Sequence, residues 1–171
     1  MHFEILRKED EPLVTKWLQE PHVNEFWYGS GLQSTLSSIT RFVKEEETLF
    51  TIWLAYDDST PFAYLMTSSI NYENDSLYAK YLARDAKAIT IDLFIGNKAY
   101  LGKGLGKKLL VEILRQKFSD VTDVFIDPSV NNARAIHVYE KVGFQKVEVF
   151  IPPWDPSSQC ILMHLTKKVI A

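Results

Sequence analysis

Hydrophobic residues recur along this chain with two different periods, and each period predicts one type of element. Alternation at every second position is typical of a half-buried strand, whereas apolar residues three and four positions apart follow one face of a helix. The first pattern predicts strands over residues 2–6, 49–56, 62–71, 89–95, 124–126, 144–151 and 159–165. The second predicts helices over residues 10–18, 36–43, 105–118 and 131–142. This mixture indicates an α+β fold.

Two stretches interrupt the pattern. Pro21 ends the helix over residues 10–18, and Phe26 to Gly29 are expected to form an aromatic loop. Residues 71–87 are long and polar with scattered tyrosines, and the pattern assigns them no element.

A glycine-rich turn joins the strand over residues 89–95 to the helix over residues 105–118. Glycine at every second position lets a ligand approach the backbone closely. The first turn of the helix leaves N–H groups unpaired and carries positive partial charge, which suits a phosphate or pyrophosphate. A tight turn or a helix cap is the simpler alternative. We favour a phosphorylated cofactor, held by Gly102, Gly104, Gly106 and the residues between them.

The spacing of this turn excludes two common phosphate loops. A P-loop requires a hydroxyl residue after its lysine, but Lys107 is followed by Lys108. A dinucleotide loop requires a different glycine spacing. The turn instead resembles the pyrophosphate loop of the GNAT acetyltransferases, although Leu101 stands where that family usually has Arg or Gln. The resemblance implies acetyl-CoA as cofactor, bound by Leu101, Gly102, Lys103, Gly104, Leu105, Gly106 and Lys107.

A second segment, residues 131–144, carries a more specific resemblance to the same family. It contains the string N-x-x-A-x-x-x-Y-E-K-x-G-F, in which Asn131 or Asn132 caps the helix and Gly143 ends it. In the GNAT family this tyrosine, here Tyr139, projects toward the coenzyme A sulfur, and the asparagine, here Asn132, lies beside the pantetheine arm. A core aromatic is the alternative for Tyr139. The family fold is a central, mostly antiparallel mixed sheet with a splayed parallel strand pair and helices on both faces.

Residues 17–165 resemble one branch of this family, the aminoglycoside 6′-N-acetyltransferases. The resemblance rests on the segment His22 to Trp27, the Ile91-Asp92 pair, the glycine loop, Asp127-Pro128-Ser129 and the helix containing Tyr139. It implies a small cationic substrate, with Asp92 next to the acceptor amine. It further implies that other ammonium groups meet Asp127 and Asp155. Trp27 either walls the acceptor pocket against sugar rings or closes the edge of the core. Siderophore side-chain acyltransferases are the main competing branch.

The residue types fit acetyl transfer to an amine. Asp92 lies in mid-strand on the face opposite Ile91, Leu93 and Ile95, where a charge needs a partner. A cationic amine is such a partner, and hydrogen bonds to the backbone or Thr90 are the alternative. We expect Asp92 to accept the amine proton, Tyr139 to protonate the departing thiolate, and a backbone N–H near Phe94 or Ile95 to stabilise the oxyanion.

Composition agrees with one catalytic domain over residues 1–171 and limits its partners. The net charge of −3 argues against nucleic acid as a partner, since a phosphate backbone calls for a basic surface. No apolar run is long enough to span a membrane, and no signal peptide is visible. The single cysteine, Cys160, is read as a packed thiol and suits the cytoplasm. The four scattered histidines lack metal-ligand spacing, so no metal site is expected.

Two alternatives stay open besides the siderophore branch. One is a GNAT domain that acetylates proteins or peptides, and the other is a silent coenzyme A-binding module. Retention of both Asp92 and Tyr139 argues against the silent module, which has no chemical need for either residue. The sequence leaves the natural acceptor and the oligomeric state open.

Overall fold

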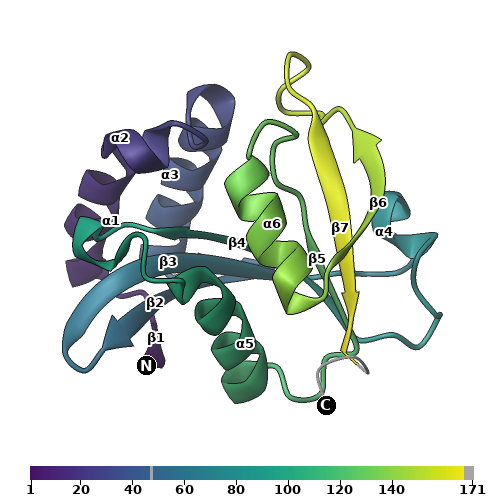
Figure 1. The fold of residues 1–171 in the computed structure, drawn as a ribbon, viewed down its shortest axis with the longest axis horizontal. Helices are drawn as coiled ribbons and strands as arrows, with labels where there is room; N and C mark the ends of the chain where they lie inside the picture. Colours follow the sequence, from purple (N-terminus) through teal and green to yellow (C-terminus); the bar gives the residue numbers. More distant parts are fainter. Residues whose placement is uncertain (47, 168–171) are drawn as a thin grey trace.

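The computed structural model describes residues 1–46 and 48–167, which form a seven-stranded sheet in the order β1-β2-β3-β4-β5-β7-β6 (Figure 1). Strands β4 and β5 pair in parallel, and the other neighbours pair antiparallel. This arrangement confirms the predicted mixed, mostly antiparallel sheet. The strands are β1 His2–Ile5, β2 Phe50–Asp57, β3 Thr60–Ser69, β4 Ala88–Ile95, β5 Asp123–Ile126, β6 Gln145–Phe150 and β7 Cys160–Thr166.

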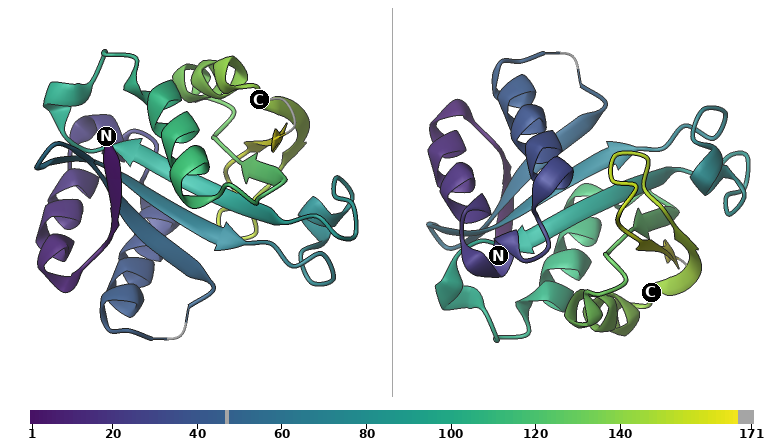
Figure 2. Two further views of the ribbon diagram at one scale, coloured as in Figure 1. Left: turned by 90° about the horizontal axis from the view of Figure 1, so that it is seen from below. Right: turned by 90° about the horizontal axis from the view of Figure 1, so that it is seen from above.

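Helices cover both faces of this sheet, as expected. Figure 2 shows α1 and α3 on one face and α5 and α6 on the other. Each face has its own buried core, one built around Trp17 and Ile39 and one around Leu110 and Ile136. The helices are α1 Glu11–Leu18, α2 Pro21–Asn24, α3 Gly29–Val43, α4 Ser76–Ala79, α5 Leu105–Lys117 and α6 Ala133–Val142, with short 3-10 turns at Lys8–Asp10 and Lys98–Tyr100.

The parallel pair separates after three residues. Ala88, Ile89 and Thr90 of β4 pair with Asp123, Val124 and Phe125 of β5, whereas the rest of β4, up to Ile95, pairs only with β3. The two strands diverge beyond this point (Figure 1). The predicted splay is therefore present, and it opens the sheet beside the second half of β4.

Two glycines allow close packing, one between α1 and the end of β4 and one between α5 and α6. A Cβ on Gly96 would lie 2.1 Å from Cδ2 of Trp17, so only glycine lets this indole pack on the end of β4. A Cβ on Gly106 would lie 3.2 Å from Cγ1 of Val138, so the first turn of α5 packs closely on α6. The glycine loop is thereby held beside the helix that carries Tyr139.

The predicted loops differ from the structure in three places. Pro21 ends α1 as expected, but it also occupies the first turn of α2, where its missing N–H costs little. Gly29 is not a loop residue, because it begins α3 with φ +54°. The unassigned stretch over residues 71–87 contains α4, and Asn71 starts a turn by accepting the Glu73 N–H at 2.9 Å.

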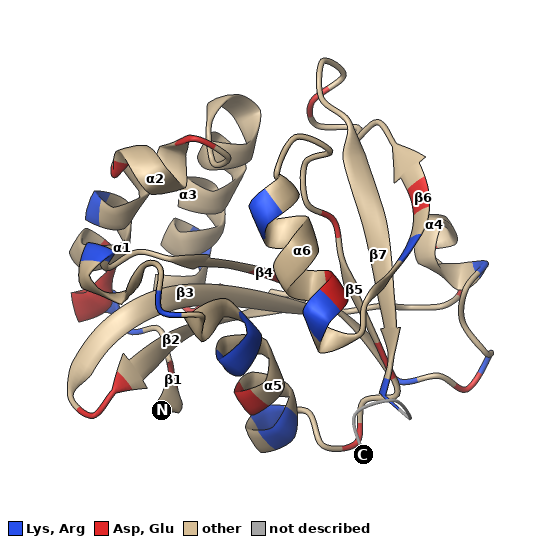
Figure 3. Cartoon of the chain, in the orientation of Figure 1, with Lys and Arg blue, Asp and Glu red and all other residues tan. Residues whose placement is uncertain are grey.

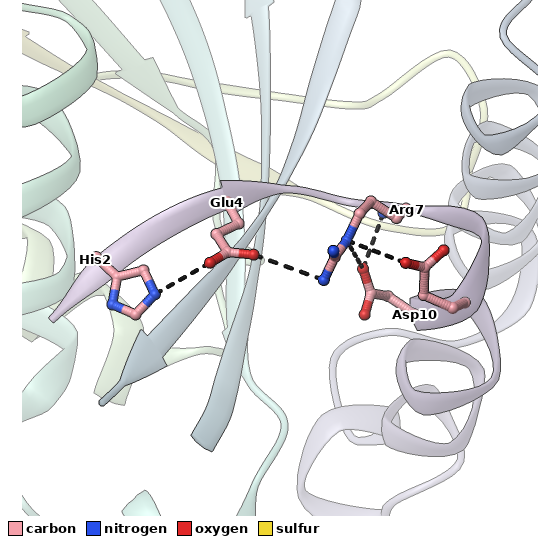
Figure 4. Close-up of polar contacts among 5 residues, drawn as sticks. His2, Glu4, Arg7 and Asp10 are labelled. Atoms are coloured by element: carbon pink, nitrogen blue, oxygen red, sulfur yellow. Dashed lines mark hydrogen bonds and ion pairs between the residues drawn. The ribbon is translucent and has the colours of Figure 1, made fainter. Parts of the chain in front are cut away.

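Charged residues line the N-terminal edge of the sheet. Arg7 lies within 3.4–3.7 Å of the carboxylates of Glu4, Glu9 and Asp10, and His2 contacts Glu4 at 3.3 Å (Figure 4). Such exposed pairs contribute little stability, because solvent and salt screen the charges. Charges on an edge strand do, however, discourage pairing with another chain.

Candidate active site

The divergence of β4 and β5 opens a cavity of about 320 Å³, a size common for small-molecule sites. Its walls come from segments far apart in the sequence: the residues before and within α3, strands β3 and β4, the end of β5, the start of α6, and the loop between β6 and β7. Of the predicted site residues, the cavity brings together Trp27, Asp92, Asp127, Asn132, Tyr139 and Asp155.

Two carboxylates at the cavity lie in partly buried positions. Asp92 comes from β4, and Asp127 follows β5 directly. Burial raises the pKa of Asp92 to about 6. Burial, and then the negative charge of Asp92, raise the pKa of Asp127 well above its usual value. Neither forms an ion pair with a residue that the structure describes. An ammonium group entering the cavity would supply the missing positive charge.

Asp155 differs from this pair because its carboxylate accepts hydrogen bonds from residues of its own loop. The Ser157 N–H and the hydroxyls of Ser157 and Ser158 donate to its carboxylate, and these bonds lower its pKa. Asp155 therefore brings a full negative charge to the cavity rim. Its hydrogen bonds also give it a structural role in this loop.

Helix α6 contributes Tyr139 and Asn132. The Asn132 side chain caps α6 by accepting the Ala135 N–H at 3.1 Å, and Gly143 ends the helix with φ +117°. The Tyr139 ring packs near Phe144, at 6.0 Å between centroids, and its residue also lines the cavity. Burial, followed by the charges of Asp92 and Asp127, raises the pKa of Tyr139. Its phenol is therefore protonated at neutral pH.

An aromatic row forms the wall beside α3. Trp27 meets Phe94 edge-on at 5.2 Å, and its indole N–H donates to Thr35 Oγ1 at 3.1 Å. Trp27 therefore packs against the core and also lines the cavity. Trp154 also lines the cavity and is 54% exposed.

The hydrogen-bond pattern of β4 decides which backbone groups face the open side. Gly96 N–H donates to Phe62 O and Ile70 N–H donates to Ala88 O, both at 2.9 Å. In an antiparallel pair of strands, hydrogen-bonded and non-hydrogen-bonded residue pairs alternate. The backbone N–H and C=O groups of the even-numbered residues of β4 therefore bond to β3, whereas those of the odd-numbered residues point away from β3. The geometry therefore favours Ile95, together with Leu93, over Phe94 as the free N–H donor.

His22 holds the end of this strand. Its Nε2 lies 2.9 Å from the carbonyl oxygen of Ile95. Nε2 is therefore the protonated nitrogen, and the contact fixes the last residue of β4.

The glycine loop lies outside the cavity, at the start of α5. Gly102 and Gly104 adopt φ +71° and +67°, and no atom lies within 4 Å of a Cβ built on either. Gly104 also occupies the N-cap of α5, where unpaired N–H groups point outward. Lys103, Lys107 and Lys108 are exposed here, and Figure 3 shows basic residues along this loop and α5. The loop fits a pyrophosphate group, and Leu101, 38% exposed, adds no polar contact.

Sequence reasoning missed several residues of the cavity. Tyr64 and Met66 line it from β3, which places them on the same face as Asp92. Cys160 also lines it, and burial, followed by the charge of Asp127, raises the pKa of this thiol to about 11. Only the pairing register could have identified Tyr64 and Met66.

Some classes of site find no support in the described part of the chain. Residues 1–46 and 48–167 contain no group of three His, Cys, Asp or Glu side chains able to hold a metal ion. Within the same ranges, no helix has the length and apolar character needed to cross a membrane.

A splayed sheet, a glycine loop at a helix N-terminus and an acidic cavity are the features expected of an acyltransferase that uses a coenzyme A thioester. The family model for the acetyltransferase (GNAT) domain matches residues 7–151. The chain therefore belongs to the GNAT acetyltransferase family and is an N-acetyltransferase whose cofactor is acetyl-CoA.

Three of the proteins that this chain resembles are named for a narrower activity. Aminoglycoside N(6′)-acetyltransferase type 1 of Klebsiella pneumoniae is 30% identical over 166 residues, which cover 90% of this chain and 78% of that protein. An aminoglycoside N(6′)-acetyltransferase structure from Legionella pneumophila is 37% identical with a TM-score of 0.89, covering 99% of this chain and 93% of that one. A third structure, an aminoglycoside acetyltransferase with coenzyme A and kanamycin, is 25% identical with a TM-score of 0.74, covering 98% and 95%.

Gly104→Val is expected to raise the KM for acetyl-CoA at least tenfold. A β-branched side chain at φ +67° is strained, and it stands over the N–H groups that face the pyrophosphate. Gly29→Val is the matched control, because Gly29 also has positive φ and open space at the start of a helix. The control should lose similar thermal stability and keep the KM for acetyl-CoA. Equal KM values for Gly104→Val and the wild type would show that the loop does not bind the cofactor.

Proposed function

We propose that this enzyme transfers the acetyl group of acetyl-CoA to the 6′-amino group of aminoglycosides. The observation that carries the proposal is the pair of partly buried carboxylates, Asp92 and Asp127, without a cationic partner in the described structure. A polycationic amino sugar supplies two such partners at once. The relatives named as aminoglycoside 6′-N-acetyltransferases, and the neighbour with bound kanamycin, support this substrate class.

Asp92 is proposed to hold the reacting amine and accept its proton at a carboxylate oxygen. An amine is mostly protonated at neutral pH and must lose a proton before it attacks a carbonyl. Burial raises the pKa of Asp92 to about 6, which makes it a stronger base than an exposed aspartate. It nevertheless remains ionised at neutral pH, ready to accept the proton.

Tyr139 is proposed to give its phenolic proton to the departing sulfur. Acetyl-CoA would supply the acetyl thioester; residues 101–107 would hold its pyrophosphate, and Asn132 would lie beside its pantetheine. The N–H groups of Leu93 and Ile95 face away from β3 and would hold the carbonyl oxygen. Asp127 and Asp155 would bind further ammonium groups, and Trp27 would lie against a sugar ring.

The substrate is tested by acceptors that differ in one group. Purified enzyme is expected to release coenzyme A thiol from acetyl-CoA with kanamycin or tobramycin. Analogues with a hydroxyl in place of the 6′-amine should give no release above background. A peptide panel and hydroxylamine-type siderophore precursors serve as competing acceptors. Activity on 6′-hydroxyl analogues, or on no aminoglycoside at all, would overturn the assignment.

Asp127→Asn is expected to raise the KM for kanamycin about tenfold. A charge-assisted hydrogen bond contributes about 1.5–3 kcal/mol, and the neutral amide keeps the shape but loses the charge. The KM for acetyl-CoA should stay unchanged. Asp120→Asn is the matched control, because this exposed carboxylate pairs with Lys87 at 2.9 Å and lies outside the cavity. An unchanged KM for kanamycin in Asp127→Asn would remove Asp127 from the substrate contacts.

A further inference from the structure

Tyr64 is a buried tyrosine in the cavity wall whose hydroxyl has no assigned use. It lies in β3, is 1% exposed, and its ring stacks on Phe94 at 4.9 Å and 13°. Within residues 1–46 and 48–167, its Oη atom finds no hydrogen-bond partner. The residue lines the same cavity as Asp92.

The pairing of β3 with β4 places this side chain next to Asp92. Tyr64 pairs with Phe94, and Met66 pairs with Asp92, so all four side chains lie on one face of the sheet. Tyr64 and Asp92 are diagonal neighbours, a separation that an aromatic side chain can bridge. Burial, and then the charge of Asp92, raise the pKa of Tyr64. The hydroxyl therefore remains protonated beside the carboxylate.

The hydroxyl adds nothing that the fold needs. A phenylalanine would keep the stacking on Phe94 and would avoid burying a polar atom without a partner. Buried hydroxyl groups are usually hydrogen-bonded, because leaving one unpaired costs free energy. An unpaired, buried hydroxyl on a residue that lines this cavity therefore points to a partner that arrives with the substrate.

We infer that the Tyr64 hydroxyl positions the acceptor amine, with Oη accepting a hydrogen bond from an N–H of the nitrogen that Asp92 also holds. This inference deepens the proposed function and rests on it. Two oxygens from adjacent strands would then fix the orientation of one nitrogen.

The test is Tyr64→Phe, measured by steady-state kinetics with kanamycin and by thermal unfolding. We expect kcat/KM for kanamycin to fall at least tenfold, with the KM for acetyl-CoA unchanged. The melting temperature should stay equal or rise, because the variant removes an unpaired buried hydroxyl. Tyr56→Phe is the matched control: its hydroxyl interacts with Arg7, and it lies outside the cavity. The control should keep wild-type kinetics.

The outcomes separate this inference from the proposed function. Wild-type kinetics in Tyr64→Phe, while the wild-type enzyme acetylates kanamycin, would overturn the inference alone. A melting temperature of Tyr64→Phe lowered by more than about 3 °C would show that the hydroxyl is bonded within the protein. That result would overturn the inference whatever the substrate is. A wild-type enzyme inactive on kanamycin would reject the proposed function. Tyr64→Phe is then compared on the acceptor from the competing panel that the enzyme does acetylate.

Discussion

Replacing Asp92 by asparagine is expected to lower kcat by about 10²–10⁴-fold, the range typical of a lost general base. Asparagine keeps the size and one carbonyl oxygen, so the amine can still bind at the wall of the cavity. The amide cannot take the proton that the amine must lose. The measurement is thiol release at saturating acetyl-CoA and kanamycin, with the KM for acetyl-CoA as the internal check on folding and cofactor binding.

The pH dependence gives an independent readout of the same group. The pKa of Asp92 is raised to about 6, and the ionised form is the base. For the wild type, kcat/KM should therefore fall as the pH drops through about 6. This acid limb should be absent in Asp92→Asn. An acid limb of equal size and position in both enzymes would assign it to another group and remove Asp92 as the base.

Raising the pH should lower the stability of the wild type while it raises the activity. Because the pKa of Asp92 is higher in the folded chain than in the unfolded chain, folding binds protons between about pH 4 and 6. The wild type therefore loses stability as the pH rises through this window, and Asp92→Asn should lose less. At pH 7.5 the variant is expected to melt at or above the wild-type temperature, so unfolding would not explain its lost activity.

The sequence predicts the elements well where one period dominates. The alternation from Ile89 to Ile95 predicts β4 and the face on which Asp92 lies. Gly143 correctly marks the end of α6, and Asn132 is one of two asparagines predicted as its cap. These predictions succeed because capping and alternation depend on neighbours within a few residues. The carboxylates Asp92, Asp127 and Asp155 could be placed in one cavity only through the resemblance to a known family.

The remaining parts of the site depend on contacts between distant segments. Tyr64 belongs to an apolar run in which nothing local marks its hydroxyl, and only the register of β3 against β4 places it beside Asp92. Cys160 fits a packed thiol by sequence, yet as the first residue of β7 it bridges to Ser129, and it lines the cavity. The preference for Ile95 over Phe94 likewise follows from strand pairing, which no local pattern reveals.

Tyr139→Phe is expected to lower kcat by about 10²–10⁴-fold while leaving the KM for acetyl-CoA unchanged. The phenylalanine ring keeps the contact with Phe144 at 6.0 Å and fills the same volume, so the change isolates the hydroxyl. Burial, followed by the charges of Asp92 and Asp127, raises the pKa of Tyr139, so its phenol is protonated at neutral pH and can donate to the departing sulfur. Because a thiolate is a weaker base than this phenolate, the step is completed when the proton that Asp92 takes from the amine returns to the phenol.

The control for this variant is Tyr81→Phe, whose hydroxyl donates to Glu148 at 2.9 Å and lies outside the cavity. It should keep wild-type kinetics. If Tyr139→Phe keeps the wild-type kcat, the hydroxyl is not the proton donor, and Tyr139 is a wall of the thioester site. A raised KM for acetyl-CoA with unchanged kcat would instead assign the hydroxyl to cofactor binding. Because an interaction made only in the transition state lowers kcat and kcat/KM together, the two roles give different results.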